Sequence, residues 1–301
     1  MRRLGELFDV VRSSGKPVKI AVVAGHDENV LKSVAEAQSM GIAESILYGD
    51  TKETEKLAEA LGVDLSELRL IHAPDPLEAA RMAVETISKG EADLLMKGKI
   101  KTGELMSLVL QKEYGLRTGR TLSMVSVFEI PSYPKLLIVS DAGMIISPDL
   151  QQKVDMIENT VRVAQILGID TPKVAIIGAV EVVNPKMPVT LDAAALAKMS
   201  DRHQLKHCVV DGPFALDNAV SREAALHKGI ESPVAGDADV LIMPDIEAGN
   251  VFYKAMVFLA NAKVASSIVG ARVPVVLTSR ADNDETKLLS IALSALIALK
   301  G

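Results

Sequence analysis

Three lysines and two glycines lie close together in the segment KGKIKTG, residues 97–103. The segment directly follows an apolar run, so it falls where a buried strand would end. Glycines there would let the backbone approach a ligand closely, and lysines would supply positive charge, which suits phosphate groups. The candidate binding residues in this segment are Lys97, Gly98, Lys99 and Thr102. The pattern is equally consistent with an ordinary basic turn, and it is not a P-loop, because GxxxxGK[S/T] is absent.

A serine and an arginine stand side by side after the last apolar run of the chain. Arg280 can hold a phosphate or an acyl phosphate through its forked guanidinium group. Ser279 can donate a hydrogen bond to a carbonyl oxygen on which negative charge develops. The acids that follow, Asp282, Asp284 and Glu285, are better explained one by one as helix caps and partners of the helix dipole.

A third polar segment, PDIEAGN at residues 244–250, follows the very apolar run 238–243. It contributes Asp245, Glu247 and Asn250 as candidate binding residues. Acids placed ahead of a helix often serve only its dipole. Polar groups that converge with a glycine at a strand end can also form one wall of a binding site, and we retain both interpretations.

Other chemistry is not predicted by the residues present. His203 and His207 are four apart and adjacent to Cys208, but there is no second ligand pair and no HExxH, so a metal site is not expected. Cys208 lies in an apolar run and is expected in the core rather than as a nucleophile. The absence of GxGxxG after the first strand and of GxSxG disfavours a nicotinamide-binding Rossmann enzyme and an α/β-hydrolase.

Short apolar runs alternate with longer amphipathic segments along the whole chain. The expected strands are 18–24, 45–48, 68–72, 93–96, 173–178, 207–211, 238–243 and 274–277. The expected helices are 29–40, 52–61, 76–89, 150–167, 191–202, 248–262 and 283–299. This alternation predicts an α/β fold with parallel, doubly wound sheets. In such sheets ligands bind beyond the carboxyl ends of the strands, where the polar segments above are expected.

Two further apolar runs, 122–128 and 135–140, are joined by EIPSYP without a helix between them. The prolines break the strand pattern, so we expect a β-rich crossover there and place a domain junction at it. Ser147 is expected to be the N-cap of the next helix, with Pro148 at its first position. No flexible linker is visible, which suggests that the chain crosses between domains more than once.

The chain has 301 residues, which favours two domains. Its net charge is −6, without a basic arm, which argues against nucleic acid as a partner. It contains one cysteine and no apolar run long enough to cross a membrane. We therefore expect a cytoplasmic protein that acts on small molecules and has no membrane partner.

At several loops the sequence resembles one known family. The long segment SPVAGDADVLIMPDIEAGN at residues 232–250 resembles the signature of the phosphate acetyl/butyryltransferases. DGP at 211–213, followed by Leu-Asp at 216–217, is similar to a second segment of that family. MKGK at 96–99 and TSRAD at 278–282 resemble its butyryl branch, whereas the acetyl branch usually has Ser-Arg-Gly at the last of these positions.

The resemblance implies a fold similar to the isocitrate and isopropylmalate dehydrogenases, with two α/β/α domains that have mostly parallel sheets and flank a cleft. By that analogy the first domain comprises residues 1–133 plus 277–301, and residues 134–276 form a second domain that mediates dimerisation. A homodimer or a higher homo-oligomer is expected from the same resemblance.

The resemblance also implies the reaction butyryl-CoA plus phosphate to butyryl phosphate plus CoA, by direct phosphorolysis in a ternary complex. Coenzyme A and phosphate would be substrates, with no metal and no permanently bound cofactor. A phosphate acetyltransferase, or less readily a hydroxy-acid dehydrogenase of the same fold, is the alternative.

The resemblance carries over to individual residues as well. Arg280 would hold phosphate and Ser279 would stabilise the developing oxyanion. The family has a carboxylate base a few residues further on, and Asp282 and Asp284 both qualify, with Glu285 as a further choice. Lys97, Lys99 and Thr102 would meet phosphate or the pantetheine and diphosphate of CoA, beside the 244–250 segment.

Overall fold

The computed structural model describes residues 1–277 and 282–301. The chain divides into two compact units, and each is described by itself. One, called here the N/C unit, comprises Leu4–Arg120 and Ala265–Gly301. The other, the central unit, comprises Thr121–Val264 and Met1–Arg3. The domain limits suggested by the sequence, 1–133 plus 277–301 and 134–276, stay a prediction.

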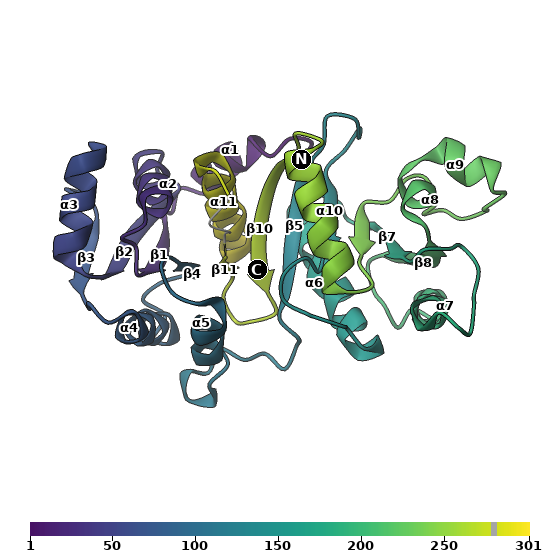
Figure 1. Ribbon diagram of the computed structural model, residues 1–301, viewed down its shortest axis with the longest axis horizontal. Coiled ribbons are helices and arrows are strands. Elements are labelled where there is room, and N and C mark those ends of the chain that lie inside the picture. The colour runs from purple at the N-terminus through teal and green to yellow at the C-terminus, as the bar shows by residue number, and fades with distance from the viewer. Residues whose placement is uncertain (278–281) are drawn as a thin grey trace. The chain divides into compact units, whose positions relative to one another are not determined.

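The sheet of the N/C unit has the strand order β3-β2-β1-β4-β11-β10 (Figure 1). Its strands are β1 (Val18–Val23), β2 (Ala43–Gly49), β3 (Arg69–His72), β4 (Leu94–Lys97), β10 (Lys263–Val269) and β11 (Val275–Val276). All neighbours from β3 to β11 are parallel, whereas β10 pairs with β11 antiparallel. Residues 20–23 of β1 are fully buried, as expected for a strand that is covered by helices on both faces.

The helices of the N/C unit lie on both faces of that sheet. They are α1 (Glu6–Arg12), α2 (Glu28–Ser39), α3 (Thr51–Leu61), α4 (Pro76–Ser88), α5 (Thr102–Val109), the short 3₁₀ helix η1 (Lys112–Tyr114) and α11 (Asp284–Lys300). α2, α3 and α11 cover one face, and α4 and α5 cover the other (Figure 1). Asp27, Asp50 and Asp75 cap α2, α3 and α4 by accepting hydrogen bonds from first-turn amides, which explains where these helices begin.

The sheet of the central unit has the order β5-β6-β9-β7-β8. Its strands are β5 (Ser123–Glu129), β6 (Leu137–Ser140), β7 (Lys173–Ile177), β8 (Val209–Phe214) and β9 (Val240–Ile242). β5 and β6 are antiparallel, and the other neighbours are parallel. The helices are α6 (Leu150–Ile166), α7 (Pro188–Asp201), α8 (Leu216–Val220), α9 (Arg222–His227) and α10 (Ile246–Phe258).

Aromatic side chains fix α10 on the sheet of the central unit. Phe128 on β5 meets Phe252 and Tyr253 of α10 edge to face, with ring centroids 5.8 and 5.5 Å apart. Such pairs add attraction beyond the area that they bury. The N-terminal turn of α10, which carries three candidate binding residues, is therefore placed by a well-packed core.

The α/β fold class with mostly parallel sheets is confirmed, and the two adjacent runs before α6 do form an antiparallel pair. The predicted N-cap Ser147 is wrong. Asp149 caps α6 instead, in a capping box with Gln152, because its carboxylate reaches the backbone N–H of that residue at 2.8 Å.

β10 was not among the strands expected from the sequence. Ser266 and Ser267 interrupt its apolar pattern, although both are buried. α11 supplies partners for them: the Ser266 backbone N–H donates to Ser290 Oγ at 3.0 Å, and Ser294 Oγ donates to Ser267 Oγ at 2.9 Å. The buried hydroxyl of Ser267 is acceptable because it has a hydrogen-bond partner, and a strand pattern does not reveal partners on a distant helix.

Candidate active site

The strand order of the N/C unit reverses between β1 and β4. The chain runs from β1 outward through β2 to β3 on one side and then returns to β4 on the other. In open α/β sheets the crevice beyond the carboxyl ends of two such strands is where ligands bind. The predicted phosphate segment begins at this point, because Lys97 is the last residue of β4.

Gly98 holds the β4 loop tightly against the end of β1. Its N–H donates to Val23 O at 2.8 Å, and the N–H of Lys99 donates to Ala24 O at 2.9 Å. A Cβ atom on Gly98 would lie 2.3 Å from Ala24 O, so no larger residue fits without a backbone shift. The glycine therefore serves strand-to-loop packing, which places the following residues.

The lysines of this loop have different surroundings. Lys97 is partly buried, and its Nζ donates to the carbonyl oxygens of Gly98 and Ile100, each at 3.0 Å, so it braces its own loop. Lys99 and Lys101 are exposed. Lys101 is the N-cap of α5 and gives that helix no side-chain cap, while Thr102 is its first residue. An uncapped helix start beside exposed lysines suits an anion such as a phosphate group.

The two candidate bases, Asp282 and Asp284, lie on either side of the N-cap of α11. Asn283 is its N-cap, and its side chain accepts the N–H of Thr286 at 2.8 Å, so the suggested capping by Asp282 is wrong. Asp282 precedes the helix, whereas Asp284 lies in the first turn. The pKa of Lys32 on α2 is raised, mainly by its hydrogen bond with Glu28 and to a lesser extent by the charges of Glu28 and Asp284. Ser279 and Arg280 lie outside the described residues.

In the central unit, the three candidates at the start of α10 are close to the loop that follows β6. Asp245 caps α10, and its carboxylate accepts the N–H of Ala248 at 2.8 Å. Asn250 Nδ2 donates to Ala142 O at 3.2 Å, and Glu247 is exposed in the first turn. A Cβ atom on Gly249 would lie 2.0 Å from Asp141 O. Asp245 thus has the helix-start role that was one of its two interpretations, and Asn250 has a structural contact that the sequence did not predict.

Asp141 stabilises the loop that α10 contacts, and it was not among the predicted site residues. It is 2% exposed and accepts hydrogen bonds from the backbone N–H groups of Met124, Gly143 and Met144 at 2.6–2.7 Å. Burial raises the pKa of Asp141, and these backbone hydrogen bonds partly offset that rise. Its sequence signal is an acid that directly follows an apolar strand.

Some alternative chemistry can be assessed from the described residues. Among them, no group of three or more His, Cys, Asp or Glu side chains is arranged to hold a metal ion. Burial raises the pKa of Cys208 to about 11, so its thiol stays protonated near neutral pH and is a poor nucleophile. None of the described helices is both long enough and apolar enough to span a membrane.

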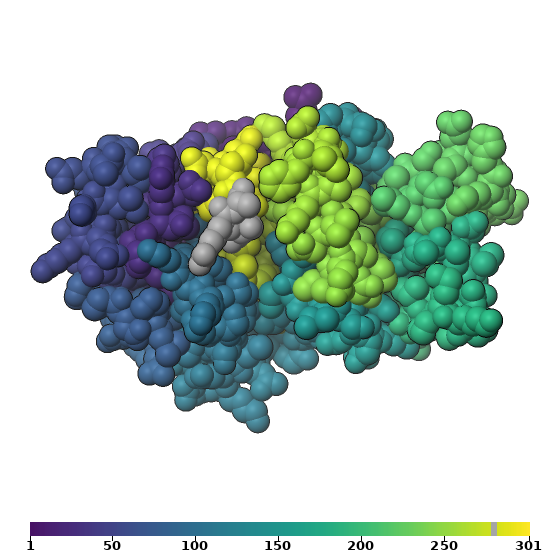
Figure 2. All heavy atoms as spheres, viewed as in Figure 1, coloured from purple at the N-terminus to yellow at the C-terminus, as the bar shows by residue number. Residues whose placement is uncertain are grey.

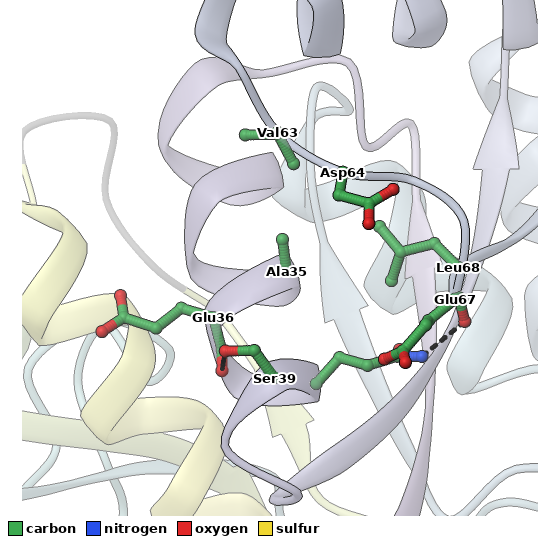
Figure 3. Close-up of a pocket in the computed structure, with 8 residues that line it drawn as sticks. Ala35, Glu36, Ser39, Val63, Asp64, Glu67 and Leu68 are labelled. Carbon is green, nitrogen blue, oxygen red and sulfur yellow. Dashed lines mark hydrogen bonds between the residues drawn. The ribbon is translucent and has the colours of Figure 1, made fainter.

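A pocket of about 290 Å³ in the N/C unit lies between α2 and the segment before β3 (Figure 3). Its labelled lining includes the acids Glu36, Asp64 and Glu67. α2 runs back from the carboxyl end of β1, so its last turns reach the opposite, amino edge of the sheet. The acidic lining and this location do not suit a phosphate-bearing substrate, and none of the predicted site residues lines the pocket.

Comparison with known proteins gives one consistent result. Residues 72–295 match the family model described as phosphate acetyl/butaryl transferase. The chain belongs to this family. A phosphate acetyltransferase of Thermotoga maritima is 58% identical over 98% of this chain and 99% of the relative. A phosphate butyryltransferase of Clostridium acetobutylicum is 51% identical over 93% of each chain.

Solved structures agree with this assignment. A branched-chain phosphotransacylase from Enterococcus faecalis superposes with a TM-score of 0.83 at 32% identity, covering 93% of this chain and 99% of that one. A 4-hydroxythreonine-4-phosphate dehydrogenase from Klebsiella pneumoniae, 13% identical, shares the fold with a TM-score of 0.51 over 94% of this chain and 98% of its own. The predicted family, the dehydrogenase-like fold class and an acyltransferase activity of the phosphotransacylase type are thereby confirmed.

Proposed function

We propose that this acyltransferase converts butyryl-CoA and phosphate to butyryl phosphate and CoA. The observation that carries the proposal is the match of nearly the whole chain to a phosphate butyryltransferase at 51% identity. The phosphate acetyltransferase at 58% identity supports acetyl-CoA as the second candidate substrate. The TSRAD segment, which resembles the butyryl branch, is our reason for naming butyryl first.

The chemistry is a direct displacement. A phosphate oxygen attacks the thioester carbonyl carbon, the carbonyl oxygen becomes an oxyanion, and the C–S bond then breaks to release CoA as a thiolate that takes up a proton. No acyl-enzyme is needed, so the protein must hold two anionic substrates in line and neutralise charge. In reverse, a thiol with a pKa near 8.5 must lose its proton, which a carboxylate base assists.

We assign each step to candidate residues. Arg280 holds phosphate, and Ser279 donates to the oxyanion. For the base we favour Asp282 over Asp284, because Asn283 and not Asp282 caps α11, whereas Asp284 lies in the first helical turn, where it serves the helix dipole. The uncapped start of α5, with Lys99 and its neighbours, supports binding of a phosphate group of CoA or of free phosphate.

CoA release from a panel of acyl-CoA thioesters, with and without phosphate, tests the proposal. Phosphate-dependent release is expected with the highest kcat/KM for butyryl-CoA. Each methylene that is added or removed should change kcat/KM by about tenfold or more, the discrimination available to an apolar pocket. A maximum at acetyl-CoA or at a branched acyl-CoA would replace butyryl by that acyl group. Release that does not depend on phosphate for any acyl-CoA would refute the reaction itself.

Arg280→Ala tests the assignment of the phosphate-binding residue. We expect kcat/KM for phosphate to fall by roughly 10³-fold while the far-UV circular dichroism is unchanged, because a preorganised cation at the reacting phosphate is lost. Arg81→Ala, a change of an exposed arginine on α4, is the matched control. Near-normal turnover by Arg280→Ala would remove Arg280 from the mechanism.

Assembly and location are also part of the proposal. We propose a homodimer, since α10 lies open on the surface in Figure 2 and exposes Val251, Phe258 and Leu259. Light scattering of the purified protein tests this.

We place the enzyme in the cytoplasm with no resident cofactor, since its substrates are intracellular metabolites and its one cysteine excludes an internal disulfide.

A further inference from the structure

A lysine is buried near the N-terminus of α11. Lys287 is 2% exposed. Its Nζ donates a hydrogen bond to the backbone carbonyl oxygen of Asp282, and its own N–H donates to Asn283 O at 3.2 Å. The side chain therefore reaches back past the N-cap to the residue that precedes the helix.

This placement opposes two ordinary preferences. Burial of an ammonium group costs hydration free energy that only well-placed acceptors offset. A cation near a helix N-terminus also meets the positive end of the helix dipole. The flanking residues Thr286 and Leu288 are buried as well, so a methionine at position 287 would fill the space without either cost. Residues that break local rules in this way are found mainly at functional or strained sites.

The central unit offers a buried lysine for comparison. Lys153 on α6 is 3% exposed, and its Nζ lies 2.6 Å from a carboxylate oxygen of Asp192 on α7. That ion pair joins two helices of one core and needs no catalytic explanation. Lys287 contacts the backbone of Asp282, which lies outside its own helix and two positions after Arg280 in the sequence.

We propose that Lys287 is a positioning residue for acyl transfer. Its ammonium group fixes the backbone of Asp282, the residue that we assign as the base, and thereby sets the direction in which that carboxylate points. The inference rests on the proposed function, since it gives Lys287 a role in that reaction. A displacement of about 1 Å at a reacting group can cost about 10²-fold in rate.

Three variants test the proposal. Lys287→Met removes the charge and the donors, Lys287→Arg retains both, and Lys153→Met removes a buried lysine remote in sequence from the candidate base. For Lys287→Met we expect kcat to fall about 30-fold with KM for acyl-CoA within about twofold, since positioning of a base acts in the transition state. Lys287→Arg should regain kcat to within about threefold of wild type. Lys153→Met should lose thermal stability but keep kcat within about twofold.

Several outcomes would overturn the proposal. A folded Lys287→Met enzyme with kcat within twofold of wild type would do so, as would an equal loss of kcat in Lys153→Met. If Lys287→Met does not fold, Lys287→Gln is compared with Lys287→Arg. Glutamine is one chain atom shorter than lysine and uncharged, so its kcat should be at least tenfold lower than that of the arginine variant, and equal values would again overturn the proposal.

A second measurement separates this inference from the proposed function. If the wild-type protein shows no phosphate-dependent CoA release, the proposed function fails, and hydrogen exchange then tests the contact itself. The amides of residues 282–287 should exchange at least tenfold faster in Lys287→Met than in Lys153→Met. Equal exchange would mean that Lys287 does not anchor this segment.

Discussion

The loop after β4 and the loop after β9 have the same backbone plan but different chemistry. Each follows a buried parallel strand and leads into a helix, and each connection is packed tightly at a glycine: Gly98 in the loop after β4, and Gly249 in the first turns of α10. After β9, Asp245 caps α10 with its own carboxylate. After β4, Lys101 at the N-cap of α5 provides no side-chain acceptor, and its exposed ammonium group lies 3.5 Å from a carboxylate oxygen of Glu104 in the first turn.

The difference shows what a strand-to-helix loop needs in order to bind an anion. The positive end of the helix dipole is present in both loops, but an acidic cap already satisfies it in α10 and would repel a phosphate group. In α5 the first amides receive no cap from Lys101, and nearby lysines add attraction. We therefore expect substrate phosphate at α5 and a mainly structural role for the start of α10.

The largest expected effect is a loss of stability when either tightly packed glycine is replaced. Gly98→Ala and Gly249→Ala should each lower the free energy of unfolding by roughly 3 kcal/mol or more, because the new Cβ would overlap a carbonyl oxygen of the adjacent loop. Urea unfolding followed by circular dichroism measures the change. Gly103→Ala in α5 is the control, since a Cβ there meets nothing within 4 Å.

The control variant should be neutral or stabilised by up to about 1 kcal/mol, because alanine favours a helix over glycine. If Gly98→Ala were as stable as Gly103→Ala, the two loops would not share a close-packing requirement. The loop after β4 would then have no fixed geometry on which to build a phosphate site.

The sequence predicted these loops better than it predicted what their residues do. Alternating apolar and amphipathic segments were enough to place the strands that end at Lys97 and Ile242, because strands buried on both faces are continuously apolar. The two interpretations of Asp245 could not be separated, since capping depends on the distance from a carboxylate to one backbone N–H. Lys287 gave no signal at all, because a lysine near a helix start is normally assumed to be exposed.

The second prediction concerns the acidic N-cap, which α10 has and α5 lacks. Lys101→Asp would give α5 an acidic N-cap like that of α10. We expect the helix to gain about 0.5–1 kcal/mol, while KM for phosphate or for acyl-CoA rises about tenfold, because the new carboxylate occupies and neutralises the helix start. Steady-state kinetics at low and at physiological ionic strength measure both constants.

Lys112→Asp makes the same charge change on η1 and serves as the matched control. It should leave both KM values within about twofold of wild type, since a remote surface charge is largely screened at physiological salt. Equal increases in the two variants would show that overall charge, and not the start of α5, determines binding.

The smallest expected effect tests the structural role of the α10 cap. Asp245→Ala should cost about 1 kcal/mol of unfolding free energy, because the N–H of Ala248 loses its acceptor. Asp245→Ser should restore most of that loss, since serine is also a good N-cap but carries no charge. Both variants should keep KM for acyl-CoA within about twofold if Asp245 only caps the helix. A serine variant of normal stability with a raised KM would instead assign the carboxylate to substrate binding, and the contrast between the two loops would then no longer explain where phosphate binds.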